Sequence, residues 1–150
     1  MFEFTETVPL QRPAADVWAM LIDFPHVPAW EGGVLEVRQT SPGRPAVGTT
    51  FAARRVYAGR ERVVDCRIID WQDQRSVAME ILGGPTGRTT VRYSVDMTSD
   101  RACRVTYSAQ GEMVPLLAWL SPLIPLVGRR LIRSNLATLE RLLEDAARGA

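Results

Sequence analysis

Apolar residues near the C-terminus recur at steps of three and four, which is the spacing of one face of an α-helix. Ser121 followed by Pro122 favours a helix start, because serine caps N-termini and proline suits the first turn, and Gly149 favours a stop. The pattern predicts a helix over residues 121–148, roughly 40 Å long, whose apolar stripe needs a partner surface. That stripe consists of Ile124, Val127, Leu131, Ile132, Leu136, Leu139, Leu142, Leu143 and Ala146.

The middle of the chain alternates apolar and polar residues over short runs separated by turn residues, the pattern of β-strands. We predict strands near residues 34–40, 49–57, 60–71, 75–82, 88–98 and 102–112. A further strand at 2–9 places Phe2, Phe4 and Val8 on one face, although Glu6 interrupts that face. The connections are short, which favours antiparallel neighbours in a meander.

Two short helical segments are predicted between the first strand and the second. Pro13 opens a helix that runs to Asp23, and further prolines limit the next segment to one or two turns with Trp30 as its anchor. The whole order is one strand, two short helices, six strands and a long helix. It is an α+β order, in which helices cover one face of an antiparallel sheet. We therefore look for a site in a cavity between the long helix and the sheet.

Strand parity predicts which side chains face the long helix, because alternate residues of a strand lie on opposite faces of the sheet. If Ile68 faces inward, then Val64, Cys66 and Asp70 share its side. The same reasoning gives an inward face made mostly of aliphatic and aromatic residues. Its members on the other strands are Phe51, Ala53, Arg55, Tyr57, Val77, Met79, Ile81, Val91, Tyr93, Val95, Met97, Val105, Tyr107, Ala109 and Gly111.

The composition is that of one ordinary globular domain over residues 1–150. The 18 basic residues, all arginine, are balanced by 17 acidic residues for a net charge of +1, which argues against a nucleic-acid partner. Cys66 and Cys103 are interpreted as buried free thiols of a cytoplasmic protein, and the N-terminus lacks an export pattern. With one histidine and two separated cysteines, we expect no metal site and no cofactor.

Several short sequence motifs accompany this order of elements. They are Pro13-Ala-Ala-Asp-Val-Trp18, Asp23-Phe24-Pro25, Val27-Pro28-Ala29-Trp30, Val47-Gly48-Thr49, Ile68-Ile69-Asp70-Trp71 with Arg75, and Asn135-Leu136-Ala-Thr-Leu139. Together they resemble the START-like superfamily, also called the Bet v 1-like or SRPBCC group. Within it, the chain is similar to the polyketide cyclase/dehydrase and lipid-transport branch of small bacterial proteins. The resemblance covers nearly all of the chain, and the residues that carry it mark the fold rather than an activity.

The resemblance implies a helix-grip fold, in which a seven-stranded antiparallel sheet wraps around the C-terminal helix and leaves a pocket for an apolar small molecule. Proteins of this superfamily bind lipids, sterols, polyketides, quinones or plant hormones, and some are cyclases or hydrolases that use polar residues inside the pocket. The fold therefore implies a container and leaves its contents open.

We take a set of residues that combines this inward face with the first half of the long helix as the candidate ligand pocket. The set consists of Trp30, Phe51, Arg55, Tyr57, Val64, Ile68, Met79, Val91, Tyr93, Val95, Tyr107, Ala109, Val127, Leu131 and Asn135.

The polar members of the set, together with His26, have alternative interpretations. The tyrosines either contact a ligand or are core residues whose hydroxyls reach water, and Arg55 either faces the pocket or lies outside it if the register slips. His26, the only histidine, is either a general base near the pocket mouth or a solvated loop residue.

The apolar segment 113–127 also has two interpretations. It either passes over the pocket mouth and is buried by the helix that Pro13 opens, or it forms an exposed patch for a membrane surface or a second copy of the chain.

The preferred hypothesis is a cytoplasmic protein that binds or carries a lipid, isoprenoid or polyketide, because the predicted inward face lacks an evident acid/base pair. The alternatives are a cyclase/dehydratase-type enzyme that uses Tyr93, Tyr107, Arg55 or His26, and an interaction module that uses residues 113–127.

Overall fold

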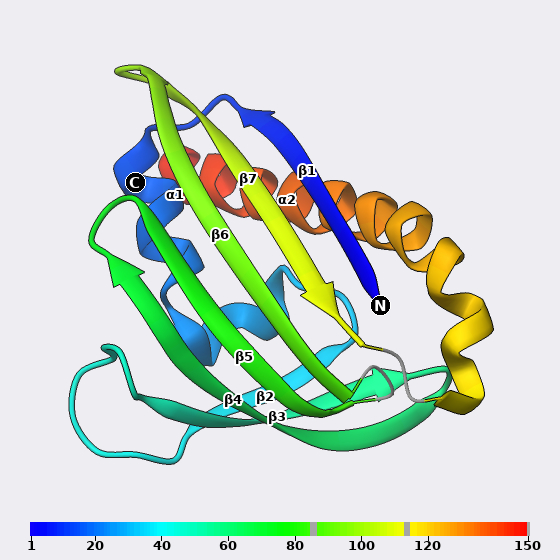
Figure 1. The fold of residues 1–150 in the computed structure, drawn as a ribbon. Coiled ribbons are helices and arrows are strands. Elements are labelled where there is room, and N and C mark those ends of the chain that lie inside the picture. Colours follow the sequence, from blue (N-terminus) through cyan, green and yellow to red (C-terminus); the bar gives the residue numbers. More distant parts are fainter. Residues whose placement is uncertain (85–86, 113–114, 150) are drawn as a thin grey trace.

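The computed structural model describes residues 1–84, 87–112 and 115–149, and these form one antiparallel sheet with a long helix across it (Figure 1). The elements in chain order are β1 (Phe2–Leu10), α1 (Ala14–Leu21), the 3₁₀ helix η1 (Phe24–Ala29), β2 (Val34–Gln39), β3 (Thr50–Tyr57), β4 (Arg60–Gln72), β5 (Ser76–Gly84), β6 (Gly87–Ser99), β7 (Ala102–Gly111), the 3₁₀ helix η2 (Pro115–Leu123) and α2 (Ile124–Arg148).

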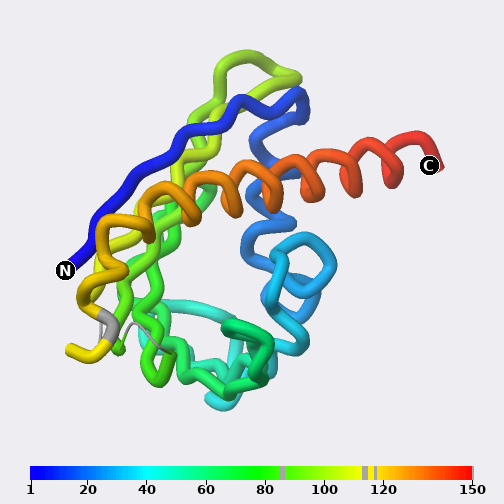
Figure 2. Tube along the Cα trace, turned by 90° about the vertical axis from the view of Figure 1, so that its right-hand side faces the viewer, coloured from blue at the N-terminus to red at the C-terminus, as the bar shows by residue number. Residues whose placement is uncertain are grey.

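The sheet has seven strands over the described residues, in the order β1-β7-β6-β5-β4-β3-β2. All neighbours are antiparallel, so the chain runs as a meander from β2 to β7, and β1 joins the far edge beside β7. The turn between β3 and β4 has positive φ at both Ala58 and Gly59, as the tightest hairpin turns require. Figure 2 shows the sheet curving so that α2 runs along one side of its hollow face. This is the predicted helix-grip fold, which the structure confirms.

Helix α2 packs on the sheet mainly through β1. Its buried side chains are Ile132, Leu136 and Leu139, with the polar Asn135 among them. Near the start of the helix, Gly128 lies so close to β1 that a Cβ atom at this position would overlap the ring of Phe4. The small residue therefore sets how closely helix and strand approach.

The structure explains the position of Glu6 in β1 and corrects the predicted start of α2. Glu6 interrupts the apolar face of β1 because its buried carboxylate accepts a hydrogen bond from Arg133 Nε of α2 at 2.8 Å. The prediction that Ser121 caps α2 is wrong, because Ser121 lies inside η2 and the helix starts at Ile124 without a side-chain cap. The 3₁₀ turn supplies the backbone geometry that leads into the helix.

Elements α1 and η1 cover the other part of the concave face. Val17, Trp18 and Leu21 of α1 are buried, and Trp18 meets Trp71 of β4 edge to face with ring centroids 5.6 Å apart. Trp30, directly after η1, is buried as expected. Figure 1 shows α1 at the end of the sheet opposite to η2, so the contact between Trp18 and Trp71 closes the core at that end.

Strand parity fails at one point of β4. The pairing of β4 with β5 shifts between Ile68 and Asp70, which is a β-bulge, and the residues after the bulge change sides. Trp71 therefore packs on the core, while Asp70 is partly exposed and accepts a 2.7 Å hydrogen bond from Arg92, which holds the pKa of Asp70 below its usual value. The expectation that Asp70 faces the pocket is wrong.

Met97 was also expected to face the helix, and it is 70% exposed. It lies in the part of the β6–β7 hairpin that projects past the helices (Figure 1), just before an irregularity in the pairing between Met97 and Ser99. The inward face of β6 is therefore buried only as far as Val95.

The segment 113–127 is not buried by α1, because α1 contacts the opposite half of the molecule (Figure 1). Leu116 is 83% exposed and Trp119 is 72% exposed. The first two residues of that segment, 113 and 114, lie outside the described residues. The described part of the segment is therefore exposed and is not covered by the helix that Pro13 opens. Among the described residues, no helix is both long enough and apolar enough to span a membrane.

The close approach of α2 to β1 predicts that Gly128→Ala destabilises the protein. Alanine gains about 1 kcal/mol of helix propensity over glycine, but the overlap with Phe4 forces repacking that typically costs about 1–3 kcal/mol. We expect a net loss of about 1 kcal/mol in urea unfolding. Gly149→Ala is the matched control, because an added Cβ there meets its nearest atom at an ordinary 3.5 Å. Equal or greater stability of Gly128→Ala than of the native protein would contradict this account of the contact.

Candidate functional site

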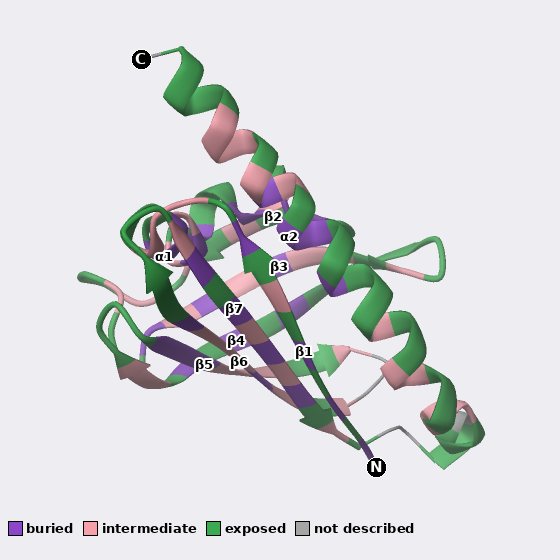
Figure 3. Ribbon diagram, turned by 90° about the horizontal axis from the view of Figure 1, so that it is seen from above, coloured by how far each residue is buried: buried purple, intermediate pink, exposed green. Residues whose placement is uncertain are grey.

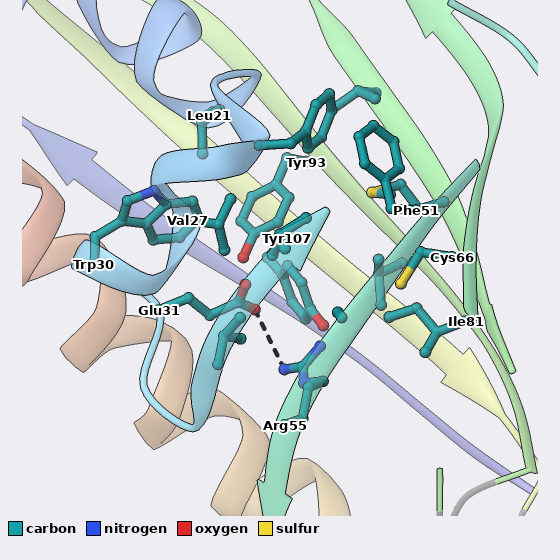
Figure 4. Close-up of a pocket in the computed structure, with 17 residues that line it drawn as sticks. Leu21, Val27, Trp30, Glu31, Phe51, Arg55, Cys66, Ile81, Tyr93 and Tyr107 are labelled. Atoms are coloured by element: carbon teal, nitrogen blue, oxygen red, sulfur yellow. Dashed lines mark ion pairs between the residues drawn. The ribbon is translucent and has the colours of Figure 1, made fainter. Parts of the chain in front are cut away.

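A cavity of about 80 Å³ lies between η1 and the concave face of the sheet (Figure 4). Its wall is mainly aliphatic and aromatic, with one ion pair set into it. The lining residues are Leu21, Phe24, Val27, Trp30, Glu31, Val34, Val37, Phe51, Ala53, Arg55, Cys66, Val77, Met79, Ile81, Val91, Tyr93 and Tyr107.

Alternation along the strands places these side chains. On β3, Phe51, Ala53 and Arg55 point to the same side, and each is two residues from the next. Across the sheet, Val77 of β5 pairs with Tyr93 of β6, which in turn pairs with Tyr107 of β7. The register thus stacks the two tyrosines side by side on the cavity wall.

Aromatic rings form a continuous row along this wall. Trp30 meets Tyr93 edge to face with centroids 5.9 Å apart, and Tyr93 meets Tyr107 in the same way at 4.9 Å. Phe4 of β1 continues the row, 5.8 Å from Tyr107. Edge-to-face rings pack tightly and fix one another's orientation, so the two hydroxyls have defined positions.

Glu31 is the cavity residue that sequence reasoning missed. It lies in the loop between η1 and β2, where strand parity gives no direction for a side chain. The loop is held on both sides: the Gly32 N–H donates to Asn135 Oδ1 of α2 at 3.0 Å, and the Val56 N–H of β3 donates to the Gly33 carbonyl at 2.8 Å. The available signal was an acidic residue between a buried tryptophan anchor and two glycines.

Glu31 and Arg55 form an ion pair across the cavity wall, with Oε1 and Nη2 3.6 Å apart and both side chains less than one fifth exposed. Burial raises the pKa of the Glu31 carboxyl, and the positive charge of Arg55 offsets part of that rise. Burial alone would lower the pKa of Arg55, but Glu31 and nearby ionisable groups reverse this, so its pKa is raised and the guanidinium stays charged. Glu31 thus brings a carboxyl from a loop to the cavity, beside a predicted inward face that offered no evident acid/base pair.

Two tyrosine hydroxyls lie beside the ion pair. Glu31, Arg55, Tyr93 and Tyr107 together form the polar corner of the cavity. Figure 4 shows the Glu31 carboxylate, the Arg55 guanidinium and the hydroxyls of Tyr93 and Tyr107 directed into the same space. Burial, reinforced by the negative charge of Glu31, raises the pKa of both tyrosines, so both are neutral donors at ordinary pH. The Tyr93 hydroxyl is buried and has no hydrogen-bond partner among the described residues. A buried donor without a partner is costly, and a ligand oxygen would satisfy it.

A more open groove of about 500 Å³ lies beside the cavity, toward η2 and the first turns of α2. The two spaces share the side chains of Arg55, Ile81, Val91 and Tyr107, which separate them. The remaining lining residues of the groove are Phe2, Phe4, Tyr57, Thr89, Ala109, Leu120, Leu123, Ile124, Val127, Gly128 and Leu131.

The structure distributes the candidate pocket residues over three places. The cavity wall contains Trp30, Phe51, Arg55, Met79, Val91, Tyr93 and Tyr107. The groove adds Tyr57, Ala109, Val127 and Leu131. The packed core, away from both spaces, holds Val64, Ile68, Val95 and Asn135. Asn135 binds the loop that carries Glu31 and does not line the cavity.

The remaining candidates for chemistry are not in the cavity as reactive groups. His26 is 74% exposed, and its Nδ1 lies 2.7 Å from Asp23 on the outer side of η1. Cys66 lines the cavity, but burial raises the pKa of its thiol to about 11, so it stays protonated at neutral pH. Within residues 1–84, 87–112 and 115–149, no cluster of His, Cys, Asp or Glu side chains could hold a metal ion.

A curved seven-stranded antiparallel sheet that grips a long C-terminal helix is the helix-grip fold of START-like proteins. The sequence matches the family described as polyketide cyclase/dehydrase and lipid transport over residues 1–144. The chain belongs to this family. No curated protein sequence matches it.

Solved structures show the same fold. A START superfamily protein from Mycobacterium smegmatis is 16% identical, with a TM-score of 0.73 and 97% of each chain covered. The Zhui aromatase/cyclase from Streptomyces sp. R1128 is 16% identical, with a TM-score of 0.77 and coverage of 95% of this chain and 93% of that one. The di-domain aromatase/cyclase BexL of the BE-7585A biosynthetic pathway is 16% identical, with a TM-score of 0.74. The match covers 96% of this chain and 47% of BexL, so the chain spans about half of that protein's length.

The raised pKa of Glu31 predicts a pH dependence of stability. The folded state holds the Glu31 proton more tightly than the unfolded chain, in which the pKa of this carboxyl is near 4.5. The free energy of unfolding therefore falls as pH rises from about 4.5 through the higher pKa of the folded state. The slope from one group is at most about 1.4 kcal/mol per pH unit. Urea unfolding of the native protein and of Glu31→Gln, at several values from about pH 4 to pH 8, measures it.

The variant removes the titrating group, so its stability relative to the native protein should improve with rising pH even though Arg55 loses its partner. Glu36→Gln is the control, because Glu36 is an exposed carboxylate of β2. Parallel pH profiles of the native protein and Glu31→Gln would show that Glu31 has an ordinary pKa.

Proposed function

We propose that this protein binds an apolar small molecule, such as a lipid, isoprenoid or polyketide, with an oxygen-bearing group held in the polar corner of the cavity. The observation that carries the proposal is the buried Tyr93 hydroxyl without a partner, in an apolar wall beside the Glu31–Arg55 ion pair. Ligand sites of this kind combine apolar surface with a few fixed polar groups. The family description, which includes lipid transport, supports the same class of ligand.

The size of the cavity constrains the ligand. Its volume of about 80 Å³ is small beside the ~300–1,000 Å³ typical of small-molecule sites. A ligand of ordinary size must therefore extend past Tyr107 and Arg55 into the groove of about 500 Å³. The proposed ligand is elongated, with its oxygen-bearing end in the cavity and an apolar remainder along the groove. Desolvation of that remainder supplies most of the affinity, at ~25 cal/mol per Å² buried.

We also place this activity in the cytoplasm. The two cysteines are buried free thiols, and a protein that keeps its thiols reduced suits a reducing compartment.

A matched pair of ligands tests the role of Tyr93. β-Naphthol and naphthalene have the same rings, and only β-naphthol carries a hydroxyl. In isothermal titration calorimetry, Tyr93→Phe should weaken β-naphthol about fivefold, which corresponds to one hydrogen bond of about 1 kcal/mol, and should leave naphthalene unchanged. Tyr57→Phe, which removes a hydroxyl from the groove, is the control and should affect neither ligand. Equal loss of both ligands in Tyr93→Phe would overturn the assigned contact.

A second candidate function, a cyclase/dehydratase-type enzyme, is favoured by Glu31. Burial raises the pKa of the Glu31 carboxyl, which makes its carboxylate a stronger base, and the Tyr93 hydroxyl can donate to a carbonyl oxygen beside it. In dehydration of a β-hydroxy ketone, the Glu31 carboxylate takes the proton α to the carbonyl while Tyr93 donates a hydrogen bond to the carbonyl oxygen. As the C–O bond to the hydroxyl breaks, Glu31 gives this proton to the leaving oxygen. The products are water and an enone, and the carboxylate is restored.

The β-hydroxy ketone that yields benzylideneacetone is a suitable probe, because the conjugated product absorbs light where the reactant does not. The enzyme hypothesis predicts that the native protein accelerates its dehydration and that Glu31→Gln abolishes this acceleration while β-naphthol still binds. Absence of acceleration by the native protein contradicts the hypothesis for this class of substrate and leaves binding as the function.

A further inference from the structure

The apolar residues of η2 and the start of α2 form an exposed ridge on the protein. It consists of Leu116, Trp119, Leu123, Leu126 and Val127, each more than half exposed. Figure 3 shows this end of α2 as mostly exposed, at the edge of the molecule beyond the sheet. Among the four tryptophans, Trp119 alone is exposed, because Trp18 and Trp30 are buried and Trp71 packs on the core.

The apolar residues of the ridge lie on the solvent-facing side of the start of α2. Leu126, Val127 and Arg130 follow one another at steps of one and three, so they share one side of the helix, and Leu123 directly precedes it. The buried residues Ile132, Leu136 and Leu139 lie on the opposite side. A solvent-facing helix surface ordinarily carries polar residues. Its apolar character here indicates a partner that takes up apolar side chains.

The charged residues in the stretch of sequence that carries the ridge are of one sign. Between Glu112 and Glu140 the sequence contains three arginines and no acidic residue. Arg129 and Arg130 are exposed, and neither has an ion-pair partner among the described residues. The described residues that line the adjacent groove likewise include no carboxylate.

We propose that the ridge, with Arg129 and Arg130, docks on the surface of a membrane that contains anionic lipids. Leucine and tryptophan side chains enter the boundary between headgroups and acyl chains, and arginines beside them attract anionic headgroups. A second copy of this chain is a poorer partner. In a two-fold contact the ridge meets itself, which places the unpaired arginines of the two copies in one interface.

The docking surface adjoins the opening of the ligand site. Leu123 and Val127 belong both to the ridge and to the groove that leads past Arg55 and Tyr107 to the cavity. A protein docked through the ridge therefore presents its groove to the bilayer, so that an apolar ligand can pass between membrane and cavity without crossing water. This passage rests on the proposed function, whereas docking itself does not.

Sedimentation with vesicles tests the docking. The protein should bind vesicles of phosphatidylcholine mixed with phosphatidylglycerol. Its affinity for vesicles of phosphatidylcholine alone should be lower by about tenfold or more. The emission of Trp119 should shift to shorter wavelength on binding, because Trp119 is the tryptophan that leaves water. Trp119→Ala and Leu126→Ser should each weaken binding and Trp119→Ala should abolish the shift, while Arg129→Gln with Arg130→Gln should remove the preference for the anionic vesicles.

The matched control is Met97→Ser with Arg101→Gln, which removes an exposed apolar residue and an exposed arginine at the far hairpin. It should bind vesicles as the native protein does. Failure to bind anionic vesicles, equal loss in the control variant, or a concentration-dependent dimer that buries Trp119 without vesicles would each overturn the docking. β-Naphthol binding by the native protein separates the two proposals. If the native protein binds β-naphthol but not anionic vesicles, the docking alone is overturned. If it binds anionic vesicles but not β-naphthol, the proposed function alone is overturned.

Discussion

One helix has to cover one face of a seven-stranded sheet, and this mismatch in width determines the rest of the structure. A helix with its side chains is about 10–12 Å across, whereas seven strands at ~4.8 Å spacing are roughly 30 Å across. Helix α2 therefore covers the sheet at its β1 edge, where Gly128 lets it approach Phe4, and the sheet must curve to enclose the remainder. Elements α1 and η1 cover another part of the same concave face. The space that none of them fills is the cavity.

The polar corner of that cavity depends on the same arrangement. Glu31 reaches the cavity only because its loop is held between α2 and β3, through Asn135 and Val56. Burial in the apolar wall raises the pKa of this carboxyl, and the ion pair with Arg55 offsets part of that rise. A group of this kind can accept or donate a proton, and it can also orient a ligand oxygen. The two proposed functions, binding and catalysis, thus depend on one set of atoms.

Much of the fold was predictable from the sequence, because strand alternation and helix periodicity are local patterns. The strands and the long helix lie where these patterns placed them, and Arg55 lies on the inward face that parity assigned to it. Parity failed at Asp70, where a bulge shifts the register, since a bulge depends on the partner strand as much as on the sequence. The start of α2 was misplaced because Ser121 lies in a 3₁₀ turn that continues into the helix.

The candidate site was less predictable than the fold. Glu31 lies in a loop, and its direction follows from tertiary hydrogen bonds that no local pattern encodes. Asn135 was taken for a pocket residue because of its place on the helix, and it instead positions that loop. The central claim is that the polar corner receives the oxygen of an apolar ligand, and a crystal structure of the protein with β-naphthol tests it most directly. The account predicts the naphthol hydroxyl within hydrogen-bonding distance of Tyr93 or Glu31; naphthol bound elsewhere, with the polar corner empty, would contradict it.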